Sequence, residues 1–184
     1  ITIRKDTAVD ATLTDVKISG ANECKLVLDG LKFAGDSYVN TASGTAELTV
    51  KNCYADVTPT KITGRSAFIV LGTTEKTSGT KVVLKDNTIV ASKGNNANGD
   101  SFAAAVFGWE YIADGSEISG NIFGSESTPY NFIAVKLMNF VAGAKVTVAN
   151  NTVYGSNAWN GFYAFDLFQN NSRDNAYELT LDNN

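Results

Sequence analysis

The chain has 184 residues, a net charge of −4 and no histidine. The lack of histidine excludes Ser-His-Asp and Cys-His nucleophile systems and the usual zinc and non-haem iron sites. Lysine and arginine are scattered, which leaves no basic stripe for nucleic acid, and no apolar stretch reaches the roughly 18 residues of a transmembrane helix.

The chain repeats one short phrase, in which an apolar strand is followed by a bend and a second strand. Copies occupy residues 26–33, 48–54, 82–90, 117–124 and 146–155, and a shortened copy occupies residues 179–184. The last apolar residue before each bend serves as an anchor, and the anchors are Leu28, Val50, Leu84, Ile118, Val148 and Leu181. Repetition every 22 to 34 residues predicts stacked coils.

The bend itself has a regular composition. Two places after the anchors stand Gly30, Asn52, Asp86, Gly120, Asn150 and Asn183, which are residue types that tolerate a left-handed backbone. The next position holds Asn in four copies: Asn87, Asn121, Asn151 and Asn184. Stacked coils would place these amides in a hydrogen-bonded column, although asparagine also suits turns without any column.

A second series of strands begins with phenylalanine and runs out of phase with the first. It occupies residues 68–71, 102–107, 132–137 and 162–167, with steps of 34, 30 and 30 residues. Each coil therefore carries three strands, and equivalent strands run parallel at about 4.8 Å. The pattern predicts an all-β solenoid of about six three-strand coils, while the direction of the phenylalanine side chains stays open.

The turn motif, the coil length and the variable loops resemble the right-handed parallel β-helix of the pectate-lyase-like superfamily, from Thr12 to Asn184. Residues 26–33 also resemble the β-helical domains of cell-surface lipoproteins from gut Bacteroidetes. The resemblance implies a secreted or cell-surface bacterial protein, lipid-anchored through a segment before Ile1. It implies no single activity, because this fold hosts lyases, hydrolases, adhesins and phage proteins.

Residues 1–184 are expected to form one β-helix domain. The last phrase stops on its bend at Asn184, which would leave apolar core and strand edges uncovered. We therefore expect further coils beyond Asn184, or end-to-end association through the C-terminal coil.

Lys136 and Asp166 are the only charged residues inside the phenylalanine-led strands, and both stand four places after the leading phenylalanine. This register predicts an outward ion pair between consecutive coils. In the alternative interpretation, Lys136 and Asp166 form a polar anchor at which Lys136 binds the uronate of an acidic polysaccharide.

Enzymatic candidates are sparse. The resemblance implies an Asp/Glu cluster for Ca²⁺ with an arginine base in lyases, or several aspartates in hydrolases, but none of the three arginines lies in a phenylalanine-led strand. Asp166 with Glu110 is the candidate carboxylate pair for glycoside hydrolysis. A Ca²⁺ site at Asp100, Asp114 and Glu117 is disfavoured because no regular Asp-x-Asp-x-Asp loop exists, so we expect no cofactor.

Aromatic residues flank the phenylalanine-led strands. Trp109, Tyr111, Tyr130 and Trp159 fall near the edges of that sheet, with Glu110 among them. Such residues bind sugar rings or fold back over apolar surface. The leading hypothesis is a non-catalytic surface module that binds a polysaccharide or glycoconjugate, for instance in adhesion. The alternatives are a polysaccharide lyase or glycoside hydrolase, and a structural spacer or self-associating stalk.

Overall fold

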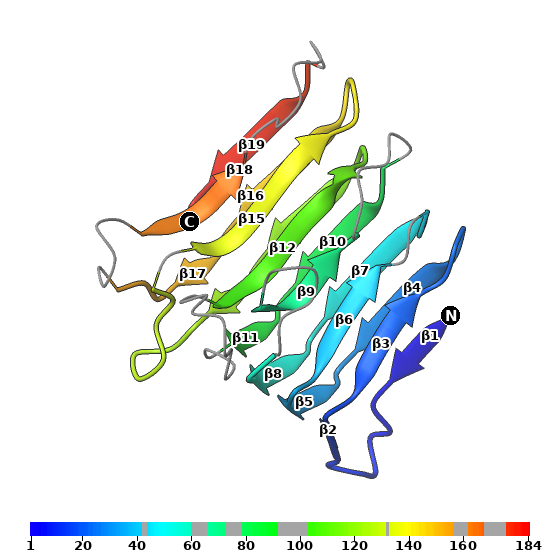
Figure 1. Cartoon of the computed structure of the whole chain (residues 1–184), viewed down its shortest axis with the longest axis vertical. Coiled ribbons are helices and arrows are strands. Elements are labelled where there is room, and N and C mark those ends of the chain that lie inside the picture. The colour runs from blue at the N-terminus through cyan, green and yellow to red at the C-terminus, as the bar shows by residue number, and fades with distance from the viewer. Residues whose placement is uncertain are drawn as a thin grey trace.

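Three parallel β-sheets run along a common axis in a computed structural model of the chain (Figure 1). The structure describes residues 1–41, 44–59, 66–72, 79–91, 103–131, 133–156, 162–167 and 176–184. Each coil contributes one strand to each sheet, so every strand pairs with its counterparts one coil before and one coil after. This arrangement is a right-handed parallel β-helix, which confirms the fold predicted from the repeats.

The sheets are named here in the order in which a coil enters them. Sheet A contains β1(Thr2–Arg4), β4(Lys25–Asp29), β7(Glu47–Lys51), β10(Lys81–Lys85), β13(Ser116–Ser119), β16(Lys145–Ala149) and β19(Glu178–Asp182). Sheet B contains β2(Thr12–Thr14), β5(Lys32–Gly35), β8(Tyr54–Val57), β11(Thr88–Ala91), β14(Ile122–Phe123) and β17(Thr152–Val153). Sheet C contains β3(Lys17–Gly20), β6(Tyr38–Thr41), β9(Ser66–Leu71), β12(Ala103–Ile112), β15(Ile133–Phe140) and β18(Tyr163–Leu167).

The core is a column of side chains enclosed by the three sheets. The sheet A anchors stack in register, and those from β4 to β16 are at most 1% exposed: Leu28, Val50, Leu84, Ile118 and Val148. Alternate residues of the same strands face solvent, as expected for strands with one buried face. Burial of the alternating apolar side chains therefore fixes the register in which neighbouring strands pair.

The predicted left-handed bends are all present. Backbone φ angles at the six bend positions lie between 48° and 69°: Gly30, Asn52, Asp86, Gly120, Asn150 and Asn183. Only glycine, asparagine and aspartate adopt this region at low cost, so the composition of the bend follows from its geometry.

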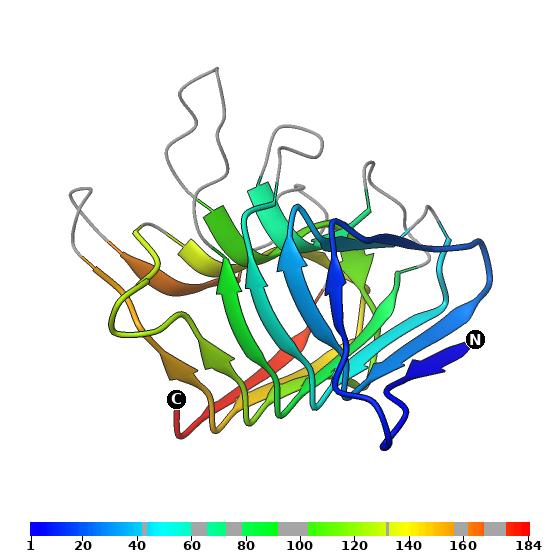
Figure 2. The same cartoon turned by 90° about the horizontal axis from the view of Figure 1, so that it is seen from below.

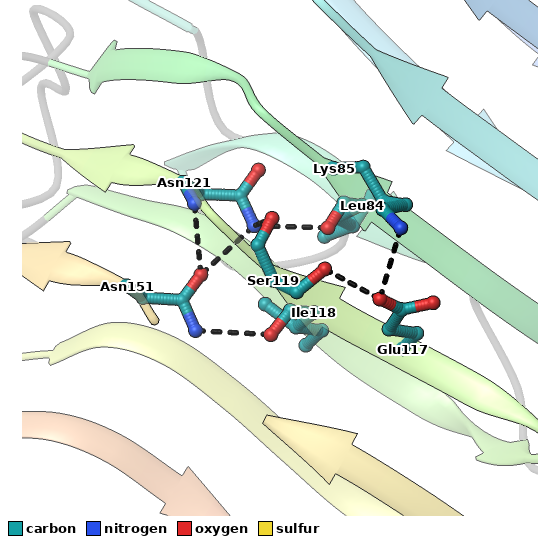
Figure 3. Close-up of polar contacts among 7 residues, drawn as sticks. All are labelled: Leu84, Lys85, Glu117, Ile118, Ser119, Asn121 and Asn151. Atoms are coloured by element: carbon teal, nitrogen blue, oxygen red, sulfur yellow. Dashed lines mark hydrogen bonds and ion pairs between the residues drawn. The ribbon is translucent and has the colours of Figure 1, made fainter. Parts of the chain in front are cut away.

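The asparagine column is also confirmed (Figure 3). Asn121 Nδ2 donates to Asn151 Oδ1 at 2.9 Å, and Asn87 Nδ2 donates to Asn121 Oδ1 at the same distance. Asn121 Nδ2 also donates to the carbonyl of Leu84 at 2.9 Å. The column passes on to Asn184, and at its other end Cys53 contributes a backbone N–H that donates to Asn87 Oδ1. These buried amides bind successive coils together.

A second column of left-handed residues lies where sheet C leads into sheet A. Its members are Glu23, Gly44, Gly79, Gly115 and Gly143, with φ angles between 57° and 89°. Buried hydroxyl groups follow three of these glycines, at Thr45, Thr80 and Ser116. The spacing of residues in the sequence does not reveal this column, because the loops between sheet C and these residues vary in length.

The outer face of sheet A carries charged side chains in pairs between neighbouring coils. Lys51 lies 3.3 Å from Asp29, and Lys85 lies 3.2 Å from Glu117. These side chains are 31–44% exposed, so each pair stabilises the fold by only about 0–1 kcal/mol.

The phenylalanine-led strands form sheet C. Phe68 is fully buried in the core. Phe162 is partly buried and packs against the core cluster. Phe102 and Phe132 lie outside the described residues. On the outer face of sheet C, a second apolar cluster is buried as well: Ala67, Val70, Ala104, Phe107 and Met138. In the described part of the chain, no helix is long and apolar enough to cross a membrane.

Candidate functional site

The outer face of sheet B is open to solvent and hollowed along the helix axis. Figure 2 shows the six strands of this sheet side by side, with their outer face towards the viewer. Tyr54 on β8 is 45% exposed and Ile122 on β14 is 40% exposed, and both side chains line the same hollow on this face. Two hollows lie on this face, which makes it a candidate site.

The sequence sets this face by simple alternation. In β8 the order Tyr54, Ala55, Asp56, Val57 places alanine and valine in the core and directs tyrosine and aspartate outward. Neighbouring strands follow the same register, which aligns Tyr54 with Lys32 on one side and Thr88 on the other. Outward residues therefore repeat once per coil, about 4.8 Å apart.

Two hollows lie next to each other on this face and share part of their lining. The first, of about 400 Å³, is lined by Tyr54, Tyr154, Asp56 and Glu126 among others. Hydroxyl groups complete the lining: Thr88, Ser125, Ser127 and Thr128. The second hollow, of about 440 Å³, extends over β5 to Thr12 and shares Tyr54 and Asp56 with the first. We call the two hollows together the sheet B groove.

A short loop after β14 forms one wall of the groove. Ser125 and Thr128 exchange backbone hydrogen bonds of 3.1 and 3.2 Å, and the Thr128 N–H also donates to Ser125 Oγ at 3.0 Å. Gly124 precedes the loop with a φ of 81°, and a Cβ there would lie 3.1 Å from the carbonyl oxygen of Tyr154. The glycine thus permits close approach between the loop and Tyr154.

Tyr130 holds this wall from inside the molecule. Its hydroxyl donates to the carbonyl of Ile89 and accepts from the N–H of Ala91, both at 3.1 Å. Its backbone N–H donates to Tyr154 at 2.9 Å. Burial raises the pKa of the Tyr130 phenol well above its ordinary value. Tyr130 is therefore a positioning residue and does not offer its ring to a ligand, contrary to the interpretation from sequence.

Two of the other predicted site residues are buried in sheet C. Glu110 and Tyr111 are each 1% exposed, near the end of the ten-residue strand β12. Glu110 Oε2 accepts hydrogen bonds from the hydroxyls of Thr41 and Thr80, both at 3.0 Å. These two side chains have no surface for contact with a glycan, and their role is in the core.

Trp109 precedes them on the same strand and is partly exposed. Its ring packs against Phe107 with a centroid separation of 5.3 Å, and its backbone carbonyl accepts a hydrogen bond from Asn139 at 3.0 Å. Trp109 thus covers the outer apolar cluster of sheet C. Trp159 lies outside the described residues.

Lys136 and Asp166 form the predicted ion pair. They are aligned between β15 and β18, and Lys136 Nζ lies 2.6 Å from Asp166 Oδ2. Their side chains are only 18% and 24% exposed. A uronate would have to displace Asp166 to reach Lys136.

The candidate catalytic and metal-binding sets are not brought together. Glu110 and Asp166 lie on β12 and β18, which β15 separates. Asp114 Oδ1 accepts the backbone N–H of Lys145 at 2.9 Å, while Glu117 is held by Ser119 and Lys85. Asp100 lies outside the described residues, within which no cluster of three metal-ligating side chains occurs.

The fold and the groove together define a class, namely parallel β-helix proteins with an open lateral groove. Comparison with known proteins takes the assignment no further, because no family model, curated protein or solved structure matches the chain. The function must therefore be argued from the groove itself.

Proposed function

We propose that this protein is a non-catalytic β-helix module that binds a glycan at a cell surface, in adhesion or polysaccharide capture, and that the sheet B groove is its binding site. One observation carries the proposal. A solvent-open groove across several coils combines two tyrosines, two carboxylates and a row of hydroxyl groups.

This set of side chains suits a sugar polymer. Tyrosine rings give apolar contact to the faces of sugar rings, and carboxylates and hydroxyls exchange hydrogen bonds with sugar hydroxyls. The groove is long and open, so an extended chain fits it better than an enclosed small molecule does. The hydrogen-bonded Ser125–Thr128 loop supplies a preorganised wall, which lowers the entropic cost of binding.

Affinity gel electrophoresis against a panel of polysaccharides tests the proposal. We expect retardation by at least one polymer, and loss of that retardation in a Tyr54→Ala/Tyr154→Ala variant. Tyr163→Ala is the matched control, because Tyr163 is 52% exposed but lies on sheet C. If a polymer retards the Tyr54→Ala/Tyr154→Ala variant as strongly as the Tyr163→Ala control, the binding site lies outside the sheet B groove. The variant Trp109→Ala then tests the site predicted from the sequence.

Glycoside hydrolysis is the second candidate, because Asp56 and Glu126 line the same hollow. Glycosidases act with two carboxylates on either side of the scissile bond. Release of reducing ends from a bound polymer, lost in Asp56→Asn, would replace the binding-module proposal with an enzyme.

A third candidate is a structural spacer or self-associating stalk, in which copies of the protein associate through strand β19. This association stays a prediction. Leu181 on that strand is 59% exposed. A concentration-dependent mass in sedimentation experiments, absent in Leu181→Lys, would support it.

A further inference from the structure

The sheet B groove contains two carboxylates, Asp56 and Glu126, on its solvent-facing side. Asp56 and Glu126 are exposed, and neither forms an ion pair or a side-chain hydrogen bond among the described residues. On sheet A, by contrast, Asp29 and Glu117 each lie within 3.3 Å of a lysine. Among the described residues, no lysine or arginine pairs with these two carboxylates, so they add negative charge to the groove.

Within the described part of the chain one lysine lines the groove, and it pairs with a carboxylate other than Asp56 and Glu126. Lys32 lines the second hollow, but its Nζ lies 2.7 Å from Asp10, which also pairs with Lys5 at 3.0 Å. Hydrogen bonding to Lys32, then to Lys5, lowers the pKa of Asp10 to about 2. Lys32 and Lys5 share the single carboxylate of Asp10, so this trio carries a net charge of +1 at the Asp10 end of the groove. The hollow that Asp56 and Glu126 line has no lysine among its described residues.

We infer that the glycan of the sheet B groove is a polymer of amino sugars with free amino groups, whose ammonium groups meet Asp56 and Glu126 while its rings contact Tyr54 and Tyr154. This inference rests on the proposed function and adds the class of sugar. Ammonium groups supply the charge that the groove lacks, and tyrosine faces also attract cations. A uronate polymer would face repulsion from both carboxylates.

The face of the sheet favours a sugar over a basic peptide. Peptides that bind β-structure add a strand at a free edge, through backbone hydrogen bonds. The backbone groups of β8, β11 and β14 are already used in pairing between coils, as in the bond from Tyr54 N–H to Leu31 at 2.9 Å. Side-chain hydroxyls, tyrosine rings and carboxylates line the groove together with Lys32 and apolar side chains such as Ile122. The hydroxyls, rings and carboxylates are groups that sugars engage.

Calorimetric titration with three oligosaccharides of equal length tests the inference: a glucosamine oligomer, its fully N-acetylated form and a galacturonate oligomer. At low ionic strength we expect the glucosamine oligomer to bind about tenfold more tightly than the acetylated one, as two exposed charge contacts predict. We expect the galacturonate oligomer to bind most weakly, and added salt to reduce the preference for free amines.

The variant Asp56→Asn/Glu126→Gln should lose the preference for free amines while it still binds the acetylated oligomer. Glu178→Gln/Asp182→Asn, on sheet A, removes the same net charge and should retain the preference. If wild-type protein binds the acetylated and glucosamine oligomers equally, glycan binding stands and the amino-sugar inference falls.

Failure of all three oligomers and of the polysaccharide panel would overturn the proposed function together with the inference. An oligolysine probe separates sugar recognition from simple charge attraction. The inference is overturned if oligolysine binds through Asp56 and Glu126 and Tyr54→Ala weakens the binding of neither oligolysine nor the glucosamine oligomer. The groove would then be a general cation-binding surface.

Discussion

At the scale of single residues, the fold depends on a few buried polar side chains that replace backbone pairing at the bends. Asn121 is 1% exposed, and its amide contacts the coil before it and the coil after it. Such a group is expensive to remove, because its partners stay buried when their hydrogen bonds are lost.

Asn121→Ala should therefore destabilise the protein by about 3 kcal/mol, since it removes the donor to the Leu84 carbonyl and the acceptor of the Asn87 backbone N–H. Urea denaturation followed by circular dichroism measures the change. Ser119→Ala is the control, because it removes one half-exposed hydrogen bond to Glu117 and should cost less than about 1 kcal/mol. Equal effects from the two variants would contradict a structural role for the amide column.

Tyr130→Phe removes a single oxygen that serves both Ile89 and Ala91. We expect a loss of about 2 kcal/mol, because the Ala91 N–H stays buried without an acceptor. The wall of the groove should also loosen, which would weaken glycan binding without removing any contact residue. Hydrogen exchange at Ala91 and at residues 124–128 reports both effects, and unchanged protection there would count against the anchoring role.

At the scale of elements, neighbouring coils are joined by pairs of side chains in register on the sheet faces. Those on sheet A are exposed and weak, whereas Lys136 and Asp166 on sheet C are largely buried and 2.6 Å apart. Burial reduces screening by water, so this pair couples β15 to β18 more strongly.

A double-mutant cycle with Lys136→Met and Asp166→Asn should give a coupling energy of about 1–3 kcal/mol, against less than about 1 kcal/mol for Lys51 with Asp29. Thermal or urea unfolding of the single and double variants supplies the values. High salt should reduce the coupling on sheet A more than that on sheet C. Coupling near zero on both faces would show that sheet C carries no special pair.

At the scale of the whole molecule, the fold favours the ionised form of two carboxylates on sheet A, because it lowers their pKa values. The pKa of Asp29 is lowered first by the Asn52 amide, and the pKa of Glu117 first by the Ser119 hydroxyl, with help from Lys51 and Lys85. Their stabilising contribution is complete above their unfolded pKa values of 3.8 and 4.5 and is lost as the pH falls through the lowered values.

The melting temperature should therefore hold steady near neutral pH and fall as the pH drops below about 4.5. An Asp29→Asn/Glu117→Gln variant should show a shallower fall, because it lacks two of the groups that become protonated. Calorimetry across this pH range checks both curves. A variant with an unchanged slope would assign acid sensitivity to other carboxylates.

The sequence predicted the architecture well because the bend motif is local. Glycine, asparagine and aspartate mark the left-handed positions, and Asn87, Asn121 and Asn151 follow at nearly constant spacing. These signals need no knowledge of distant residues, and the structure confirms them one by one.

The candidate site was harder to predict because it depends on contacts between coils. Glu110 looked like a loop residue beside Trp109, but a register shift between Gly108 and Tyr111 extends β12 and buries it. Tyr54 and Asp56 were visible as polar positions of an alternating strand. Glu126 and Tyr154, two coils or more away in the chain, line the same hollow, and this proximity depends on how the coils stack.

Because the asparagine column repeats once per coil, one complete coil can be removed without disturbing the contacts of the others. Asn87 and Asn121 occupy equivalent places one full turn apart, and each follows a left-handed residue, Asp86 or Gly120. Excision of residues 87–120 would join Asp86 directly to Asn121. The Asn121 side chain would then take the place of Asn87 and form the same hydrogen bonds to the preceding coil. The rod would shorten by one step of about 4.8 Å with its remaining layers in phase. Molecules built on this plan can change size during evolution in whole layers, without redesign of the interior.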